Sequence, residues 1–377
     1  MKLRTLLLLI GLAFSPIALG NQISLDDKIG QMIIIGFEGN EVSKNSPIIQ
    51  MIENDNIGGV ILFDYNRKTK QYDKNIESPT QVQHLNQKLQ FFTQLANFTH
   101  HRPVLPLLIS VDYEGGAVNR LKKDADFPDI SSAAEIAKLG PTKAKQIAES
   151  MALTLSTMGF NLDFAPILDV NTNPDNPIIG KLERSFSSAP DEVTTYGKIF
   201  SNMFLHYGVQ CAYKHFPGHG SSTTDSHLGY VDVTSSWKPL ELKPYQALLN
   251  TQHACGMVMT AHIVNKQLDE SGLPATLSHK ILTGVLRNQL KFQGVIITDD
   301  MQMKAISENY SLDKALVLAV NAGADMLIFG NQLSDEPQDP KEIINIIETK
   351  VKNGEISQSR IDEAYQHIIT LKQSLYN

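Results

Sequence analysis

The chain has 377 residues but only two cysteines and one tryptophan, and it has no dense run of lysine and arginine. Its formal net charge is −7, which argues against a nucleic-acid partner because phosphates require a basic face. Neither a GxGxxG fingerprint nor a P-loop follows a predicted strand, so a nicotinamide or nucleotide enzyme is not indicated. Cys211 and Cys255 both fall in apolar runs, so we expect buried free thiols. A disulfide is permitted in an oxidising compartment but is not implied.

Long apolar stretches are also missing after the first twenty residues, MKLRTLLLLIGLAFSPIALG. That segment has a positive start, a short apolar centre and small residues at positions 18 and 20. These features are typical of a secretory signal. We therefore expect residues 1–20 to be cleaved near Gly20, which would leave a periplasmic or secreted chain. An uncleaved anchor is the alternative. The apolar centre is short for crossing a bilayer, and we expect no membrane association of the mature form.

Short apolar runs recur along residues 21–377, and each run leads into glycine or polar residues. Such runs are typical of strands buried on both faces of a parallel sheet. Helix-compatible stretches lie between them, for example 78–98, 142–159 and 277–290, and the segment 339–375 is typical of closing helices. No low-complexity linker divides the chain, so we predict one (β/α)₈ barrel, with a doubly wound open sheet as the alternative. The predicted strands are 31–37, 58–63, 106–112, 162–170, 209–216, 256–263, 294–300 and 324–330.

Polar residues gather where five of these strands end. Parallel barrels place their active sites at the carboxyl ends of the strands, so the pattern predicts a site there. A single charged residue at a strand end would indicate only a cap or a salt bridge, but five such ends together are hard to explain by structure alone. The residues concerned are Asp112, Asp169, Lys214 with His215, His262, and Asp299 with Asp300.

The richest segment follows the fifth strand and reads KHFPGHGSSTTDSH, residues 214–227. A metal site is one interpretation, but Phe-Pro-Gly between His215 and His219 excludes the helix that would put both imidazoles on one face. Glycoside hydrolysis is another interpretation, because it requires a carboxylate on one side of the sugar and a proton donor on the other. Either Asp299 or Asp300 can supply the carboxylate. The proton donor would be His227, polarised by Asp225. Physical reasoning alone favours this class only modestly.

The same segment resembles the KHFPGHGDTxxDSH signature of glycoside hydrolase family 3, in its β-N-acetylglucosaminidase branch. The resemblance extends along nearly all of the chain, in the family's order. VDYEGGAVNRL (111–121) is similar to VDQEGGRVxRL, GVIITDDMQMKAI (294–306) is similar to the nucleophile motif GVIxSDDLxM, and 159–188 and 322–329 also match family segments.

The resemblance implies a role for particular residues. Asp299 would be the nucleophile, and His227 would be the general acid and then the general base, with Asp225 as its hydrogen-bonding partner. Asp300 lies at a variable position and would at most support them. The substrate-binding residues would be Asp112, Arg120, Arg184, Lys214 and His215. No metal or organic cofactor is implied.

Less specific interpretations remain for several residues. Arg120 and Arg184 can brace loops through salt bridges, and Lys214 can pair structurally with Asp169 or Asp299. We expect a structural role for His219, a place in the site floor for Asp169 and a place in the site wall for His262. Met303 packs either under the acetyl group of a bound amino sugar or in the core. Glu114 can be without any partner. Two departures from the family pattern, Ser221-Ser222 for Asp-Thr and Ala117 for Arg, affect the side of the cleft that takes the leaving group.

The expected activity is an exo-acting, retaining β-N-acetylglucosaminidase acting on peptidoglycan fragments or chitin oligosaccharides. The alternatives are a β-glucosidase or glycoside phosphorylase of the same family, or a catalytically inactive sugar-binding protein. The expected partner is a carbohydrate, with no nucleic acid. The sequence does not indicate an oligomeric state.

Overall fold

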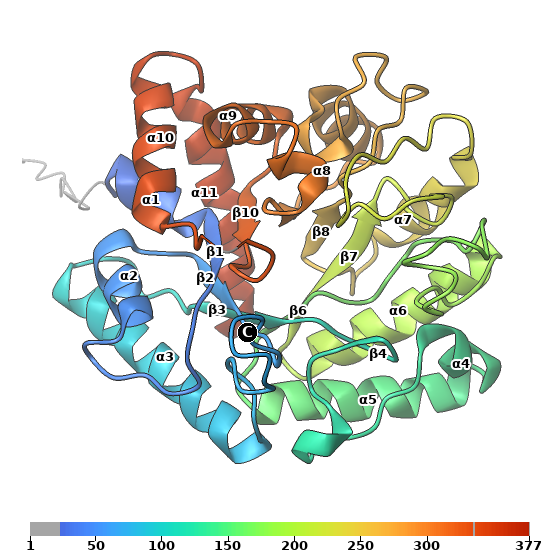
Figure 1. Cartoon of the computed structure of the whole chain (residues 1–377), viewed down its shortest axis with the longest axis horizontal. Helices are drawn as coiled ribbons and strands as arrows, with labels where there is room; N and C mark the ends of the chain where they lie inside the picture. Colours follow the sequence, from blue (N-terminus) through green and yellow to red (C-terminus); the bar gives the residue numbers. More distant parts are fainter. Residues whose placement is uncertain (1–22, 335, 377) are drawn as a thin grey trace, which may run out of the picture.

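The computed structural model describes residues 23–334 and 336–376, and eight of its strands close into one parallel barrel (Figure 1). Each barrel strand lies within one of the eight predicted apolar runs, so the predicted (β/α)₈ barrel is confirmed and the open sheet is wrong. Around the barrel the order is β1, β10, β9, β8, β7, β6, β3 and β2. The strands are β1 (Ile33–Gly36), β2 (Gly59–Ile61), β3 (Leu108–Val111), β6 (Leu162–Asp163), β7 (Gln210–Phe216), β8 (Met257–Thr260), β9 (Val295–Asp300) and β10 (Met326–Phe329).

Helices surround the strands as an outer ring (Figure 1). The three helices predicted from the sequence are confirmed, and the third has wide π-type turns. Residues 339–375 form the two closing helices, as predicted. The helices are α1 (Leu25–Gln31), α2 (Pro47–Asp55), α3 (Pro79–Thr99), α4 (Ala133–Lys138), α5 (Pro141–Thr157), α6 (Pro190–His206), α7 (Lys243–Leu248), η4 (Lys280–Gln289), α8 (Lys304–Ser307), α9 (Leu312–Ala322), α10 (Pro340–Lys352) and α11 (Gln358–Gln373). Short 3₁₀ turns are η1 (Lys123–Ala125), η2 (Pro239–Leu242), η3 (Ala275–Leu277) and η5 (Ser374–Tyr376).

Local sequence signals explain where several helices begin. Helix α3 starts at Pro79 after Ser78, whose hydroxyl accepts the N–H of Gln81. Proline is favoured at the first helical position because its missing N–H would have no partner there. Ser132 and Glu135 form a reciprocal capping box at α4. These signals set where the helices begin, while the β-branched runs form the strands of the barrel.

The strands are buried on both faces, which explains why their sequences show no alternation. In β1, Ile33, Ile34 and Ile35 are all fully buried. One contiguous apolar cluster runs through the strands and the inner faces of the helices. This core fixes the carboxyl ends of the strands in a ring, and the polar residues named above lie at these ends.

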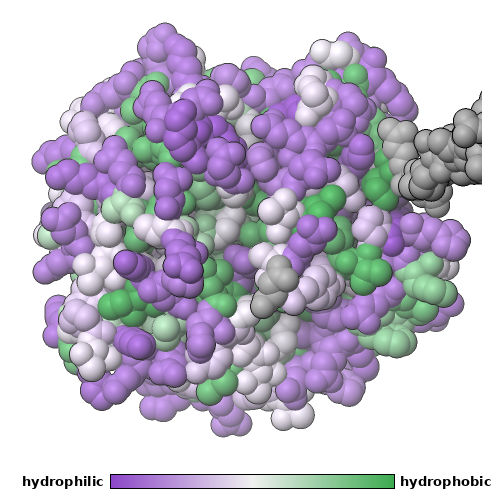
Figure 2. Space-filling model, turned by 180° about the vertical axis from the view of Figure 1, so that it is seen from behind, coloured by the Kyte–Doolittle hydropathy of each residue, from purple (hydrophilic) through white to green (hydrophobic). Residues whose placement is uncertain are grey.

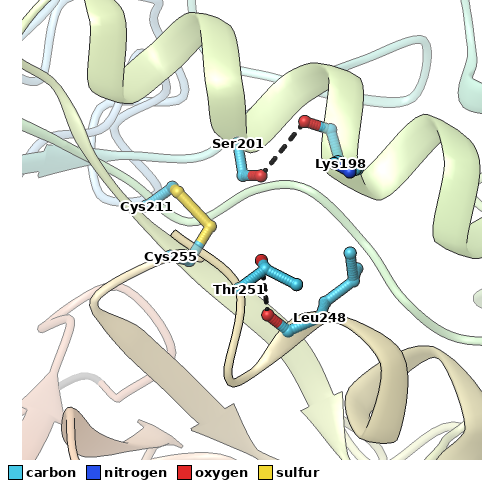
Figure 3. The surroundings of a disulfide bond; sticks show 6 residues. All are labelled: Lys198, Ser201, Cys211, Leu248, Thr251 and Cys255. Carbon is cyan, nitrogen blue, oxygen red and sulfur yellow. Dashed lines mark hydrogen bonds between the residues drawn. A yellow bond between two sulfur atoms is a disulfide. The ribbon is translucent and has the colours of Figure 1, made fainter. Parts of the chain in front are cut away.

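A disulfide joins Cys211 to Cys255, so the prediction of free thiols is wrong (Figure 3). The physical reason is strand register. Strand β7 pairs in parallel with β8, with Ala212 opposite Met257. This pairing brings Cys211, on β7, close to Cys255, two residues before β8, with their Cα atoms 4.9 Å apart. Each cysteine looks like an ordinary core residue in its own run, and only the pairing of the two strands brings the sulfurs together.

On the face of the molecule opposite to that of Figure 1, hydrophilic residues predominate and hydrophobic residues form small separate patches (Figure 2). Among residues 23–334 and 336–376, no helix is both long and apolar enough to cross a membrane. The predicted secretory signal, residues 1–20, lies outside the described residues.

Candidate active site

A pocket opens at the carboxyl ends of the barrel strands, where the sequence predicts the site. Seven of the eight predicted catalytic and binding residues line it together, and Asp225 contacts one of them from behind. The polar lining is Asp112, Arg120, Arg184, Lys214, His215, His227, Asp299, Asp300 and Gln332. Apolar side chains from six segments complete it: Ile61, Phe63, Val118, Phe164, Met259, Met303, Ile328 and Leu333.

One side of the pocket is a cluster of paired charges, which we call the charge cluster: Asp112, Glu114, Arg184 and Lys214. Lys214 Nζ lies 2.9 Å from Asp112 Oδ1 and 2.6 Å from Glu114 Oε1. Arg184 donates through Nε and Nη2 to both Glu114 oxygens, each at 2.8 Å. The charges come from β7, from the segment after β3 and from the loop after β6. The fold therefore assembles them from positions far apart in the chain.

Glu114 is the centre of this cluster, which corrects the expectation that it can be without a partner. Burial alone would raise the pKa of Glu114, but Arg184 and Lys214 outweigh burial and lower the pKa to about 2. The carboxylate therefore stays ionised and holds both cations in place. Lys214 pairs with Asp112 and Glu114, so the predicted pairing with Asp169 or Asp299 is wrong. Burial would lower the pKa of Lys214, but Asp112 and Glu114 raise it instead, and the amine stays charged.

Arg120 lies at the edge of the same side. Its guanidinium stands over the Phe63 ring, 5.7 Å from the centroid, and 3.8 Å from Asp64 Oδ1. Arg120 directly follows β5 (Val118–Asn119). Strand β5 forms a hairpin with β4 (Tyr113–Gly115), and this hairpin follows β3. Ala117, the departure from the family pattern, is exposed at the turn of this hairpin.

Asp169 fixes the end of β7 from below. Its Oδ2 lies 2.6 Å from His215 Nδ1, and its Oδ1 accepts the backbone N–H groups of His215 and His219. Asp169 therefore holds His215, which lines the pocket, but does not line the pocket itself. His219 is buried beside Ser222 and Ser226, and burial lowers its pKa to about 4. A neutral imidazole that binds its own loop suits the structural role expected for His219.

Asp299 is the ionised carboxylate of the opposite side. Burial would raise its pKa, but His262, His215 and His227 together lower it. Its Oδ1 also accepts the N–H of Asp300 at 2.8 Å. Asp299 is therefore a carboxylate at working pH, as a nucleophile requires.

The adjacent Asp300 behaves differently. Burial raises its pKa to about 6, and its Oδ1 accepts the N–H groups of Gln302 and Gly330. His262 donates from Nε2 to the Asp300 carbonyl oxygen at 3.0 Å. Burial lowers the pKa of His262, and its imidazole braces the end of β9. Met303 is buried and lines the pocket.

The segment 217–230 carries the remaining predicted pair, and we call it the β7 loop. His227 Nδ1 lies 2.8 Å from Asp225 Oδ1, which also accepts the His227 backbone N–H at 2.8 Å. The His227 side chain is 46% exposed and borders the pocket. With Nδ1 turned to Asp225, Nε2 is the ring nitrogen available to a ligand.

Sequence reasoning missed Glu241, on η2. It is fully buried and accepts the N–H of Gly220 at 3.0 Å. No motif marks it, because it lies twenty-one positions after the glycine that it contacts. Among the described residues, no group of three or more His, Cys, Asp or Glu side chains is arranged to hold a metal ion.

The closed parallel barrel and the polar pocket at its carboxyl edge define the class, a (β/α)₈ protein with a charged pocket at the ends of its strands. The chain matches the model of the glycosyl hydrolase family 3 N-terminal domain over residues 24–371, and it belongs to that family.

Two curated relatives and one solved structure show how far the likeness extends. Beta-hexosaminidase A of Pseudoalteromonas piscicida is 35% identical over 295 residues, covering 74% of this chain and 46% of the relative. The chain thus spans about half the length of that relative. Beta-hexosaminidase of Shewanella frigidimarina is 36% identical, covering 74% and 76%. The structure of a glycoside hydrolase family 3 beta-N-acetylglucosaminidase from Paenibacillus sp. superposes with a TM-score of 0.82 at 32% identity, over 94% of this chain and 63% of that one.

Proposed function

We propose that the protein is a retaining β-N-acetylglucosaminidase that releases single N-acetylglucosamine units from the non-reducing ends of β-linked glycans. The observation that carries this proposal is the meeting of ionised Asp299 and the His227–Asp225 pair at one pocket. The names of the relatives supply the sugar class, and the chemistry of the lining residues agrees with it.

In the first half of the reaction, the Asp299 carboxylate attacks the anomeric carbon and forms a glycosyl ester. The His227 imidazolium gives its Nε2 proton to the departing oxygen, so that the alcohol leaves neutral. Asp225 accepts the Nδ1–H throughout, which fixes the tautomer and the orientation of the ring. In the second half, His227 Nε2 takes a proton from water, whose oxygen attacks the same carbon and releases Asp299.

The charge cluster serves the sugar hydroxyls. Strand β3 lies opposite β9 in the ring of eight, so Asp112 faces Asp299 across the barrel. A sugar whose anomeric carbon is at Asp299 therefore directs its far hydroxyls towards Asp112, Arg120 and Lys214. Carboxylate oxygens accept these hydroxyls, and the cations donate to ring oxygens or to an acetamido carbonyl. His215 and Arg184 complete this side.

A panel of chromogenic substrates tests the proposal. The purified protein should hydrolyse an aryl β-N-acetylglucosaminide much faster than the matching β-glucoside, without added metal. Faster turnover of the glucoside would indicate a β-glucosidase. Release of sugar 1-phosphate only with added phosphate would indicate a phosphorylase, and binding of N-acetylglucosamine without turnover of any substrate would indicate an inactive sugar-binding protein. Chitobiose and a muropeptide, compared at equal concentration, distinguish the two natural substrate classes.

We also propose that the chain is exported and that residues 1–20 are removed. The disulfide between Cys211 and Cys255 supports this, because disulfides persist in oxidising compartments. The intact mass of the protein from its native host should correspond to a chain that starts near Asn21. A full-length mass would contradict cleavage.

A further inference from the structure

The base of the β7 loop lies in a narrow slot between Val170, in the segment that follows β6, and Glu241 on η2. A Cβ on Gly218 would lie 2.6 Å from the Cβ of Glu241, and a Cβ on Gly220 would lie 1.7 Å from the Val170 carbonyl oxygen. Such approaches exclude any side chain at either glycine. Trp237 Nε1 also donates to the Pro217 carbonyl at 3.1 Å. The segment 237–241 therefore contacts the loop where it leaves the strand.

Glu241 contributes a carboxyl group to this slot. Its Oε2 accepts the Gly220 N–H at 3.0 Å. The Ser221 hydroxyl lies beside this carboxyl group. In the part of the chain that the structure describes, Glu241 Oε1 and Ser221 Oγ are both buried, and neither makes a hydrogen bond to any further group. A carboxyl oxygen and a hydroxyl that face each other in a buried site satisfy one another by sharing a proton.

The surroundings of Glu241 favour its neutral form. Burial, together with the nearby Asp169 carboxylate, raises the pKa of Glu241 to about 7, although hydrogen bonds from Ser221, Lys238 and Gly220 act in the opposite direction. From α7, the Tyr245 ring also faces this region, and burial together with Asp169 and Glu241 raises the pKa of its phenol. Beyond Asp169 are His215 and His219, which bind that carboxylate rather than Glu241.

We propose that Glu241 is a positioning residue for His227: its neutral carboxyl group accepts the Gly220 N–H, donates its own proton to Ser221 Oγ and so fixes the base of the β7 loop. Polar contacts within the β7 loop connect its base, where Glu241 binds, to its tip, where His227 lies. Ser222 Oγ lies 2.6 Å from His219 Nδ1, and His219 Nε2 lies 3.3 Å from Ser226 Oγ, next to His227. The inference rests on the proposed acid/base role of His227.

The dependence of kcat/KM on the leaving group distinguishes a positioning role of Glu241 from a general loss of structure. Glu241→Ala should lower kcat/KM for chitobiose by about tenfold or more, because its sugar leaving group requires protonation by His227. An aryl glycoside with an acidic leaving group should lose less than about threefold, and the Kd for N-acetylglucosamine should not change. Glu241→Gln should restore both substrates to near wild type, because an amide accepts from Gly220 and donates to Ser221 as the neutral acid does.

A double-mutant cycle tests the contact without using activity. Glu241→Ala and Ser221→Ala should destabilise the protein by less together than the sum of their separate effects, because each removes the same hydrogen bond. Asn97→Ala is the matched control. Asn97 lies on α3, and its buried side chain donates to the Leu105 carbonyl oxygen. It should lower the Tm without any leaving-group dependence.

Equal losses on both substrates, a Gln variant as impaired as the Ala variant, or additive effects in the cycle would overturn the inference. A wild-type protein that hydrolyses neither substrate would overturn the proposed function instead. The cycle would still test whether Glu241 is bonded to Ser221.

Discussion

The two sides of the pocket are built in opposite ways. In the charge cluster, Glu114, Arg184 and Lys214 are buried and are joined by contacts of 2.6–2.8 Å between residues far apart in the chain. On the β7 loop, His227 is 46% exposed, and its partner Asp225 is only two residues away. The difference indicates a division of labour. Under the proposed function, long-range ion pairs preorganise the groups that would hold the sugar, whereas a local hydrogen bond orients the partly exposed proton donor, His227.

The largest effect is expected at the proposed nucleophile, Asp299, which belongs neither to the charge cluster nor to the β7 loop. Asp299→Ala should reduce turnover of every substrate by roughly 10⁴-fold or more, because no covalent intermediate can form. The Kd for N-acetylglucosamine, measured by calorimetry, should remain close to that of the wild type. Residual turnover within tenfold of wild type would identify another residue, with Asp300 the first to examine.

Removal of Glu114 should break the preorganised side. Glu114→Ala leaves two buried cations uncompensated, and such a loss lowers the free energy of unfolding by about 3–5 kcal/mol. Urea denaturation measures this effect. The exposed pair Lys123–Asp129 is the control, since Lys123→Ala should change the free energy of unfolding by less than about 1 kcal/mol. Similar effects of the two changes would contradict the view that the cluster is a buried network.

The disulfide sharpens the same contrast, because it links the start of β7 to the segment just before β8, away from the carboxyl ends of the strands. Its sequence separation is 44 residues, and a crosslink of this size contributes about 2–4 kcal/mol. The double variant Cys211→Ser, Cys255→Ser should therefore unfold at lower urea concentration and keep its KM. A large change in KM with unchanged stability would show that the strand ends depend on the crosslink.

The smallest expected effect concerns the loop base and depends on pH. The pKa of Glu241 is about 7 in the folded chain and 4.5 in its unperturbed state. A raised pKa means that the folded protein binds the proton more tightly, so its stabilising contribution is complete below pH 4.5 and is lost as the pH rises to 7. The shift corresponds to about 3 kcal/mol at most. Glu241→Gln should remove this decrease, so the stability difference between variant and wild type should grow in favour of the variant from pH 5 to pH 8. A difference that does not vary with pH would contradict a neutral Glu241.

Sequence reasoning succeeds where a signal is local. All eight strands are recognisable because fully buried parallel strands are continuous apolar runs, and the strand-end residues follow from the rule that barrel sites lie at that edge. Contacts between distant segments carry no such signal. The Cys211–Cys255 bond depends on strand register, the role of Glu114 depends on Arg184 seventy residues later, and Glu241 is marked by no motif at all. For such residues, three-dimensional pairing decides their role.

The account depends on a sugar carbon held between the Asp299 carboxylate and the His227 imidazole, each with its own task. The most direct test is a series of aryl β-N-acetylglucosaminides of graded leaving-group acidity, compared between the wild type and His227→Ala. The variant should lose turnover steeply for poorly acidic leaving groups and retain glycosylation for the most acidic ones, which need little protonation. An equal loss across the series would contradict the assignment of His227 as the proton donor.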